Sequence, residues 1–457
     1  AAGAQEGTEK WNDVLTAMSA GRRSPAGDAL LLRSMAIAAG PRAVAAYRRY
    51  ADLSAKRAMS RKITVGNGGD SSPELLAKSE AEARLELYAA IRSALPNAAI
   101  LLPEAASAAS IQGALRPGEI VLANMVVGDR VAIITITHDS PPTVTWSTIA
   151  YHDIVEPLHG VEARFDELLS PDEEALRFLY TALVAPVQAQ LGKSGRIIWS
   201  PDPAFARLPV AALRASSPFA VPDEPATDFL GLAHSITFVP SLSAMVSERS
   251  APPTDSPLSV AIGDIDFKQP GFPKLPETVL ARRTMDRFVA LTGGTALTGD
   301  RANLKSLQDL GDRPIKLLMF YTHGVGAQEP EGPALFLMPS GPSPSTVVKP
   351  AEIMALRVRP RFVLLAACST GASARAGAPP FGGVVRSFLV LGSRAVLASQ
   401  GRVDEAATAE LTSAIVEDMV HGNASPAEAL RHAQRRLYGT SPNPALWAQL
   451  VWVGDGD

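Results

Sequence analysis

Two unbroken apolar runs constrain the fold of this chain more than any other feature. The first, 317–321, leads into His323 and Gly324, and the second, 362–367, leads directly into Cys368, the one cysteine of the chain. Apolar runs of this length are typical of strands buried on both faces of a parallel sheet. Parallel strands of one sheet end at the same edge. We therefore expect the imidazole and the thiol to face a common crevice, where open α/β sheets place their ligands.

Strand and helix patterns alternate around these two runs. A layered α/β sheet with parallel strands is the fold class that this alternation predicts. The expected strands are 258–262, 394–399 and 450–453, and the expected helices are 277–290, 404–421 and a segment that begins after Ser425. Ser425, Pro426 and Glu428 specify the start of that last helix, because they combine an N-cap, a first-turn proline and a capping box.

The first half of the chain divides into a helical part and a mixed part. Helical spacing covers 42–63 and 72–95, with a glycine-rich turn between them. The mixed part has β-rich segments at 119–127, 131–137, 143–148 and 196–200, and an expected helix at 171–191 with Ser170 as its N-cap. A Pro- and Ser-rich linker occupies 250–257. We therefore predict an α-helical region at 1–107, a first α/β half at 108–250 and a second at 251–457.

Composition limits the classes of function. With 457 residues the chain is long enough for about three domains. A net charge of −3 gives no electrostatic reason to expect a nucleic-acid partner. The apolar runs are shorter than the ~20 residues that span a bilayer. One cysteine excludes an internal disulfide and fits a reducing compartment, so we expect a cytoplasmic location. The chain begins at Ala1 without methionine, which indicates a processed form or a fragment.

Cys368 and His323 form the pair that points to chemistry. A thiol in a strand is usually an inert packing group, but here the apolar run stops at Cys368 and a polar turn follows it. A nucleophilic thiol needs an adjacent base, which His323 can supply. The amides of Gly324 and Cys368 are the expected oxyanion donors. No cofactor or metal site is predicted. Asp264 and Asp266 follow the expected strand 258–262 and have two interpretations, a metal site or a turn cap.

Three segments resemble CHAT-domain proteases, which are caspase-like cysteine peptidases related to separase. They are Tyr321–Gly324, Leu364–Gly371 and Phe388–Ser399, and the tail from Ser425 to Trp447 agrees with the same family. The resemblance covers about 108–454. It implies a caspase-like layered sheet in which a pseudo-protease half precedes an active half, a His323–Cys368 dyad, and cleavage of protein substrates. The separation of His and Cys also matches the roughly 50 residues of caspases.

The resemblance further assigns a substrate pocket and a regulatory region. Asp404, with Glu405 beside it, falls where related peptidases bind a basic side chain, although Asp404 can equally be the N-cap of the next helix. The family often has Leu-Trp where this chain has Gln400-Gly401, which alters the wall of that pocket. The helical region resembles the spacer behind TPR repeats and implies an upstream sensor or activating partner. The loop 373–380 is expected either to become ordered on activation or to be the site of self-cleavage at Arg375.

Two functions remain open at this point. The first is a cysteine endopeptidase that cuts after a basic residue. The second is a catalytically idle caspase-like scaffold that binds a partner protein. The intact His323 and Cys368, with small residues around them, favour the first.

Overall fold

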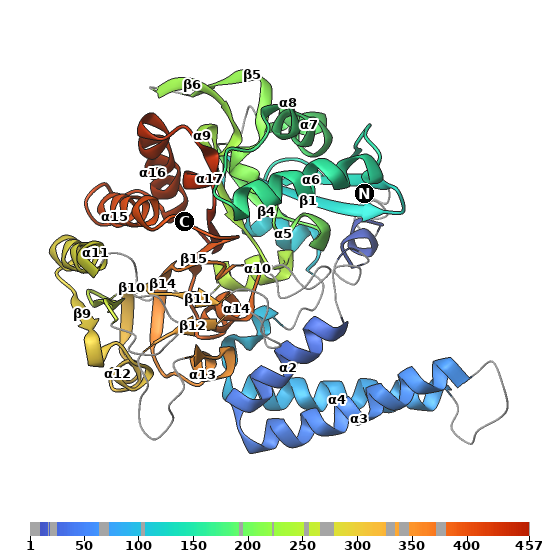
Figure 1. Ribbon diagram of the computed structural model, residues 1–457. Helices are drawn as coiled ribbons and strands as arrows, with labels where there is room; N and C mark the ends of the chain where they lie inside the picture. Colours follow the sequence, from blue (N-terminus) through green and yellow to red (C-terminus); the bar gives the residue numbers. More distant parts are fainter. Residues whose placement is uncertain are drawn as a thin grey trace.

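The protein is built around one large mixed sheet, with helices on both faces and a helical region beside it (Figure 1). This computed structural model describes residues 10–16, 18, 25–63, 73–101, 106–191, 195–221, 224–250, 256–265, 278–325, 334–337, 347–371 and 381–456. The mixed α/β class with a helical N-terminal region is therefore confirmed. Arg375 and Asp266 lie outside the described residues, as does most of the 250–257 linker.

Among the described residues, the central sheet has two antiparallel edge strands, first in spatial order, and nine strands in two parallel blocks. In spatial order they are β3 (Thr143–Trp146), β2 (Arg130–Thr137), β1 (Glu119–Val127), β4 (Arg196–Ser200), β7 (Ser235–Phe238), β16 (Leu450–Gly454), β15 (Ala395–Ser399), β14 (Arg359–Ala366), β10 (Pro314–Tyr321), β8 (Ser259–Gly263) and β9 (Thr295–Thr298). Strands β1, β4, β7 and β16 are parallel to one another, and so are β15, β14, β10, β8 and β9.

The two blocks meet where β16 pairs antiparallel with β15. The last strand of the chain therefore joins the block made from the first half to the block made from the second. Trp452 on β16 is fully buried at this junction and its ring contacts Phe362 of β14. The expected strands at 258–262, 317–321, 362–366, 394–399 and 450–453 are all present and buried. Their apolar side chains form one core that runs through both blocks.

Helices cover the sheet and connect its strands. They are α5 (Ala108–Ala114), α6 (Tyr151–Asp166), α7 (Glu173–Leu183), α8 (Gln188–Leu191), α9 (Leu230–Ala233), α10 (Leu242–Ser250), α11 (Thr278–Thr292), α12 (Leu304–Gln308), α13 (Pro350–Met354), α14 (Gly383–Val390), α15 (Glu405–Val420), α16 (Pro426–Thr440) and α17 (Pro444–Trp447). Short strands lie outside the main sheet: β5 (Arg214–Val221) with β6 (Glu224–Phe229), and β11 (Gly324–Val325) with β12 (Ala334–Phe336) and β13 (Val347–Val348).

The N-terminal helices form a separate layer beside the second block. Figure 1 shows α3 (Pro41–Ile63) and α4 (Pro73–Ala94) as a long hairpin that projects away from the sheet, next to α2 (Pro25–Ala39). The base of this hairpin packs on the body through Met354 of α13 and Val390 of α14, which share an apolar cluster with Leu87 and Ile91. The expected helices at 42–63 and 72–95 are thus confirmed as an antiparallel pair.

Two details of the first half differ from the sequence prediction. The N-cap of the expected 171–191 helix is Asp172, whose carboxylate accepts from the amide of Glu174 at 3.0 Å, and not Ser170. This segment is also not one helix, because the short 3-10 turn Ala185–Val187, which contains a proline, separates α7 from α8. Helix α6 was not predicted at all.

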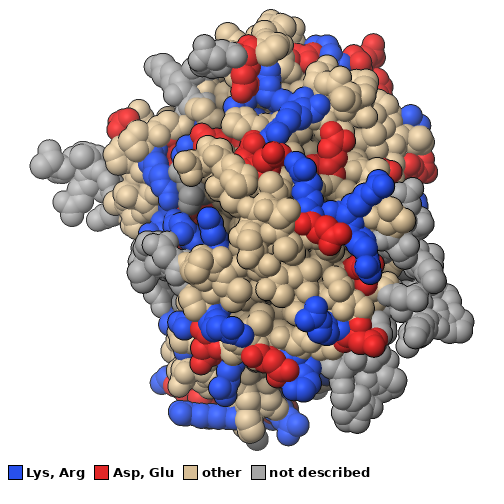
Figure 2. Space-filling model, turned by 90° about the vertical axis from the view of Figure 1, so that its left-hand side faces the viewer, with Lys and Arg blue, Asp and Glu red and all other residues tan. Residues whose placement is uncertain are grey.

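The surface carries both signs of charge. On the face in Figure 2, Lys and Arg side chains alternate with Asp and Glu, and neither sign forms a continuous area. Within the described residues, none of the helices combines the length and the apolar character needed to cross a membrane.

Candidate active site

The two sequence motifs are brought together by the register of neighbouring strands. β10 and β14 are parallel neighbours, and Tyr321 at the end of one is paired with Ala366 at the end of the other. His323 and Cys368 each follow two residues after this pair. The backbones that carry the imidazole and the thiol therefore leave the sheet side by side, at the carboxyl ends of two parallel strands.

A glycine contact locks the two motifs against each other. A Cβ atom on Gly324 would lie 2.2 Å from the carbonyl oxygen of Cys368 and 3.3 Å from its amide nitrogen. Only glycine fits this approach, so the His-Gly sequence is a packing requirement as well as a motif. His323, one residue earlier, is consequently held next to the Cys368 backbone, and both residues are half-buried.

The turn after Cys368 folds back onto the end of β15. Ser369 has a positive φ of 53°, and its amide donates to the carbonyl of Gly401 at 2.8 Å. The amide of Gly371 donates to the Ser399 carbonyl at 2.8 Å. Ser369 is thus a non-glycine residue in the left-handed region, immediately after the thiol, where backbone strain is common in functional sites.

The thiol itself lies beside the segment that follows β15. Cys368 Sγ is 3.9 Å from the carbonyl oxygen of Val403. Asp404 is the next residue, so the segment that carries the predicted pocket carboxylate adjoins the thiol. The Tyr321 hydroxyl donates to the Glu405 carbonyl at 3.4 Å, which ties β10 to the same segment.

Asp404 acts as the N-cap of α15. One of its carboxylate oxygens accepts from the amide of Ala407 at 2.9 Å, and its carbonyl accepts from the Thr408 hydroxyl at 2.6 Å. The N-cap interpretation of Asp404 is therefore correct. Capping uses one oxygen of the two, and Asp404 is only half-buried.

The Gln400-Gly401 pair connects this crevice to the first half of the chain. Buried Gln400 donates its side-chain amide to the carbonyls of Ala206 and Leu208, at 3.0 and 3.2 Å. A Cβ on Gly401 would lie 2.9 Å from a carboxylate oxygen of Asp166, the last residue of α6. A carboxylate from the first half therefore lies next to Gly401, a position near which the family often has an aromatic side chain.

Asp166 is paired with Arg207, which lies between the two carbonyls that Gln400 binds. The Arg207 guanidinium is 2.6 Å from Asp166 and 3.9 Å from Glu162. Burial acts to lower the pKa of Arg207, but the hydrogen bond and charge of Asp166 outweigh it and raise that pKa. Burial also raises the pKa of Glu162, against the opposing charge of Arg207.

Sequence reasoning missed Asp166 because it missed α6. The helix buries Ile154, Leu158, Val161 and Phe165, a clear helical spacing that the sequence already contained. Pro157 lies inside the helix and breaks the expected pattern. No local signal linked Asp166 to Gly401, 235 residues later in the sequence.

The remaining candidates have structural contacts elsewhere. Asp264 has a φ of 52° and pairs with Arg282 at 2.8 Å. Among the described residues, no group of three or more His, Cys, Asp or Glu side chains is arranged to hold a metal ion. His152 pairs with Asp129 at 2.6 Å and His432 with Asp418 at 3.1 Å, both away from the thiol.

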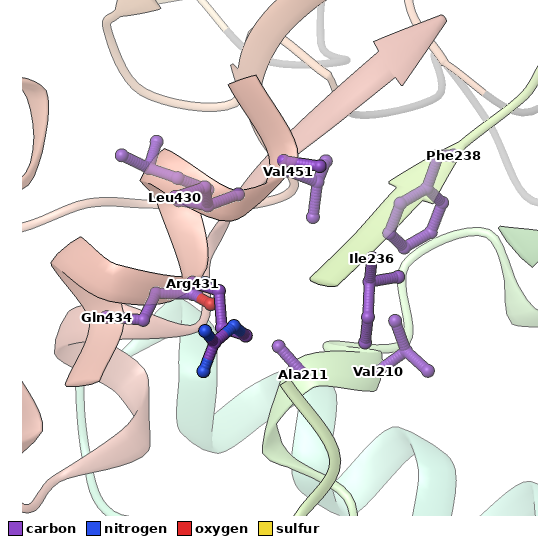
Figure 3. A pocket seen from close by; sticks show the side chains of 10 residues that line it. Val210, Ala211, Ile236, Phe238, Leu430, Arg431, Gln434 and Val451 are labelled. Atoms are coloured by element: carbon purple, nitrogen blue, oxygen red, sulfur yellow. The ribbon is translucent and has the colours of Figure 1, made fainter. Parts of the chain in front are cut away.

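A separate apolar pocket lies at the junction of the two halves. Figure 3 shows Leu430, Arg431 and Gln434 of α16 facing Ile236 of β7 and Ala211. Its lining contains neither His323 nor Cys368. Arg431 pairs with Glu224 at 2.6 Å, which lowers the pKa of that carboxyl. We regard this apolar pocket as a packing gap between the two halves of the chain.

Comparisons with known proteins give the following matches. A search of curated proteins finds no match. Among solved structures, Saccharomyces cerevisiae separase in its complex with securin is 11% identical, with a TM-score of 0.49, over 82% of this chain and 32% of the separase chain. Gingipain R, an Arg-specific cysteine proteinase, is 9% identical, with a TM-score of 0.39, over 65% of this chain and 74% of its own.

The family model described as "CHAT domain" matches residues 173–455. This match includes both strand-end motifs, the β15 segment and the final helix and strand. It therefore covers the junction of the two parallel blocks as well as the whole second block. The chain belongs to the CHAT domain family, which its motifs predicted.

Proposed function

We propose that this chain is a cysteine endopeptidase in which Cys368 is the nucleophile and His323 the general acid and base. The observation that carries the proposal is the contact of Gly324 with the Cys368 backbone, in register across two parallel strands. Both reactive residues are half-buried, so a substrate can reach them while bulk water is partly excluded.

Each group has one task in the proposed reaction. The thiol gives its proton to His323 as Sγ forms a bond to the scissile carbonyl carbon. The carbon–nitrogen bond then breaks, and the amine leaves with the proton from the imidazolium. Water, deprotonated by His323, attacks the thioester and releases the acid and the thiol. The amides of Gly324 and Cys368 are the proposed oxyanion donors.

The proposed substrate carries a basic residue before the cut. Asp404 follows the carbonyl that contacts the thiol, and Glu405 is its neighbour. A carboxylate oxygen that is not used for capping can pair with a lysine or, bidentately, with an arginine. In this proposal the second block supplies the chemistry, and the first half is a pseudo-protease half without a dyad of its own.

We also propose regulation through the helical region. The cluster that joins the α3–α4 hairpin to the body includes Met354 and Val390. α14 begins in the chain shortly after the Cys368 turn, and α13 comes between the His323 and Cys368 motifs. A sensor or partner bound to the hairpin would therefore act on elements adjoining both catalytic segments.

Peptide cleavage tests the proposal. We expect the native chain to cleave fluorogenic peptides that end in Arg or Lys, and Cys368→Ala or His323→Ala to lower kcat/KM by about a thousandfold or more. His421→Ala, at an exposed histidine on the last turn of α15, is the matched control and should retain activity. Turnover that survives Cys368→Ala would eliminate the proposed nucleophile. Binding of a partner protein without turnover would favour the idle scaffold.

A further inference from the structure

Two buried glutamines hold part of the first half against the nucleophile turn. Gln400 binds the carbonyls on either side of Arg207, and buried Gln449 donates to the carbonyl of Phe165 at 3.1 Å, the residue before Asp166. Gln400 and Gln449 are themselves joined by a 3.0 Å backbone hydrogen bond. Asp166 and Arg207 are thus each fixed through their neighbours by an amide from the second half.

Gly401 places this pair next to the thiol. Its carbonyl accepts from Ser369, the residue after Cys368, and its Cα faces the Asp166 carboxylate. Two successive contacts therefore lead from the nucleophile turn to Asp166. The side chains of Asp166 and Arg207 are 45% and 38% exposed, so solvent and a ligand can reach them.

The charge balance of this group favours a cation. Glu162 and Asp166 lie near the Arg207 guanidinium, and His159 is the other basic group near Glu162; on the formal count with histidine neutral, the group has one more negative charge than positive. A lysine or arginine carries its charge on a stem of three or four methylene groups, long enough to extend past the reacting carbonyl. An acidic side chain would meet two carboxylates, and an apolar one would leave Asp166 desolvated and unmatched.

We propose that Asp166, held by Arg207 and facing Gly401, is a specificity-determining residue that binds the basic side chain of the substrate beside the nucleophile. The pseudo-protease half thereby forms one wall of the substrate groove, in the place of the aromatic side chain that the family often has. This inference rests on the proposed function for the position of the groove, and it adds a second carboxylate opposite Asp404.

Binding without cleavage tests the role of Asp166 separately from the chemistry. The full-length chain with Cys368→Ala is titrated with a fluorescein-labelled hexapeptide containing one arginine, and with the same peptide carrying neutral citrulline at that position. We expect the arginine peptide to bind about tenfold tighter or more, because a charge-assisted hydrogen bond is at stake. Adding Asp166→Asn should reduce that ratio to about twofold or less.

Two further variants keep the test decisive. Glu167→Gln removes an exposed charge one residue away and should leave the ratio unchanged. Gly401→Ala retains every charge, but its methyl group would stand 2.9 Å from the Asp166 carboxylate, so it should also lower the ratio. Thermal melting verifies that each variant is folded.

The outcomes separate this inference from the proposed function. The role of Asp166 is overturned if neither Asp166→Asn nor Gly401→Ala reduces the arginine preference. It is also overturned if the parent chain binds both peptides equally or binds neither. If the arginine preference depends on Asp166 but the native chain cleaves no peptide, Asp166 remains the specificity-determining residue and the protease proposal is rejected. If the native chain cleaves peptides with no charge preference, the protease proposal stands and the role of Asp166 is rejected.

Discussion

The two ends of β15 handle polar groups in opposite ways. Arg394, just before the strand, pairs with Asp455, whose side chain is fully buried. Arg116 binds the same carboxylate at 2.9 and 3.0 Å, and Arg249 lies 3.2 Å away. Glu119 accepts from Arg249 at 2.6 Å. Three arginines and two carboxylates from both halves of the chain are thus joined in one largely buried cluster.

The other end of β15 carries the half-buried Cys368 turn beside the buried side chains of Ser399 and Gln400. There Ser399 and Gly401 receive the nucleophile turn, Ser369 has a left-handed backbone, and Gly324 presses on Cys368. At the first end of β15, burial acts to raise the pKa of Asp455, but the surrounding arginines outweigh burial and lower that pKa. The end of β15 at Arg394, the cohesive end, therefore holds the two halves together. The end at Ser399, the reactive end, has a strained backbone beside the reactive residues.

The largest effect is expected at the cohesive end. Asp455→Ala would remove the carboxylate that Arg394 pairs with and leave Glu119 alone to match Arg116 and Arg249, so unfolding should become easier by about 3–5 kcal/mol. Urea denaturation of the full chain measures this. Asp139→Ala, whose side chain is 85% exposed, is the control and should stay within about 0.5 kcal/mol of the native chain. A loss below about 1 kcal/mol for Asp455→Ala would show that the arginine cluster does not hold the halves together.

The next effect is expected at the reactive end, and on activity more than on stability. In Gly324→Ala the new methyl group would meet the Cys368 carbonyl at 2.2 Å, so one of the two catalytic segments must move. A displacement of about 1 Å lowers kcat/KM about a hundredfold, and overpacking costs about 1–3 kcal/mol. Gly113→Ala, in α5 with nothing within 4 Å, should be neutral or stabilising by up to about 1 kcal/mol. Full activity in Gly324→Ala would mean that the two segments are not coupled.

The reactive end was largely predictable from sequence, and the reason is local. Buried parallel strands are continuous apolar runs, so 317–321 and 362–367 identify both strands and their shared edge. The equal distances from Tyr321 to His323 and from Ala366 to Cys368 follow directly once the strands are paired in register.

The junction of the halves was not predictable, because its contacts are remote in sequence. Nothing near 450–453 indicates that β16 lies between β7 and β15, or that it is antiparallel to β15. The hydrogen bonds from Gln400 to Ala206 and Leu208 join residues that are 194 and 192 positions apart, and no local pattern marks such a pairing. Ser170 failed as an N-cap because Asp172, two residues on, offers a carboxylate at the actual first turn.

The pH dependence of stability sharpens the contrast at the cohesive end. Burial, aided by the charge of Asp455, raises the pKa of Glu248 well above its ordinary 4.5. Such a carboxyl binds its proton more tightly in the folded chain, so its stabilising contribution is complete below pH 4.5 and is lost as pH rises toward the folded-state pKa. Glu248→Gln should therefore be more stable than the native chain at pH 8, with the difference vanishing near pH 4.5.

Urea midpoints measured at several pH values check this behaviour of Glu248. Glu410→Gln, at an exposed position of α15, is the control and should show no such trend. A Glu248→Gln advantage that is constant with pH, or that grows as pH falls, would contradict the buried protonated carboxyl.

The smallest effect is expected from relief of strain at the reactive end. Ser369 has a φ of 53°, a conformation that costs a non-glycine residue about 1–2 kcal/mol. Ser369→Gly removes that cost, but glycine also gains freedom in the unfolded chain, worth about 0.4–1 kcal/mol. The net result should lie between no change and a gain of about 1.6 kcal/mol in the free energy of unfolding. Ser441→Gly, at an extended residue with a φ of −138°, incurs only the second term and should be slightly destabilising. If Ser369→Gly instead costs more than the control, the serine side chain stabilises the turn, and the reactive end is not the strained partner in the comparison.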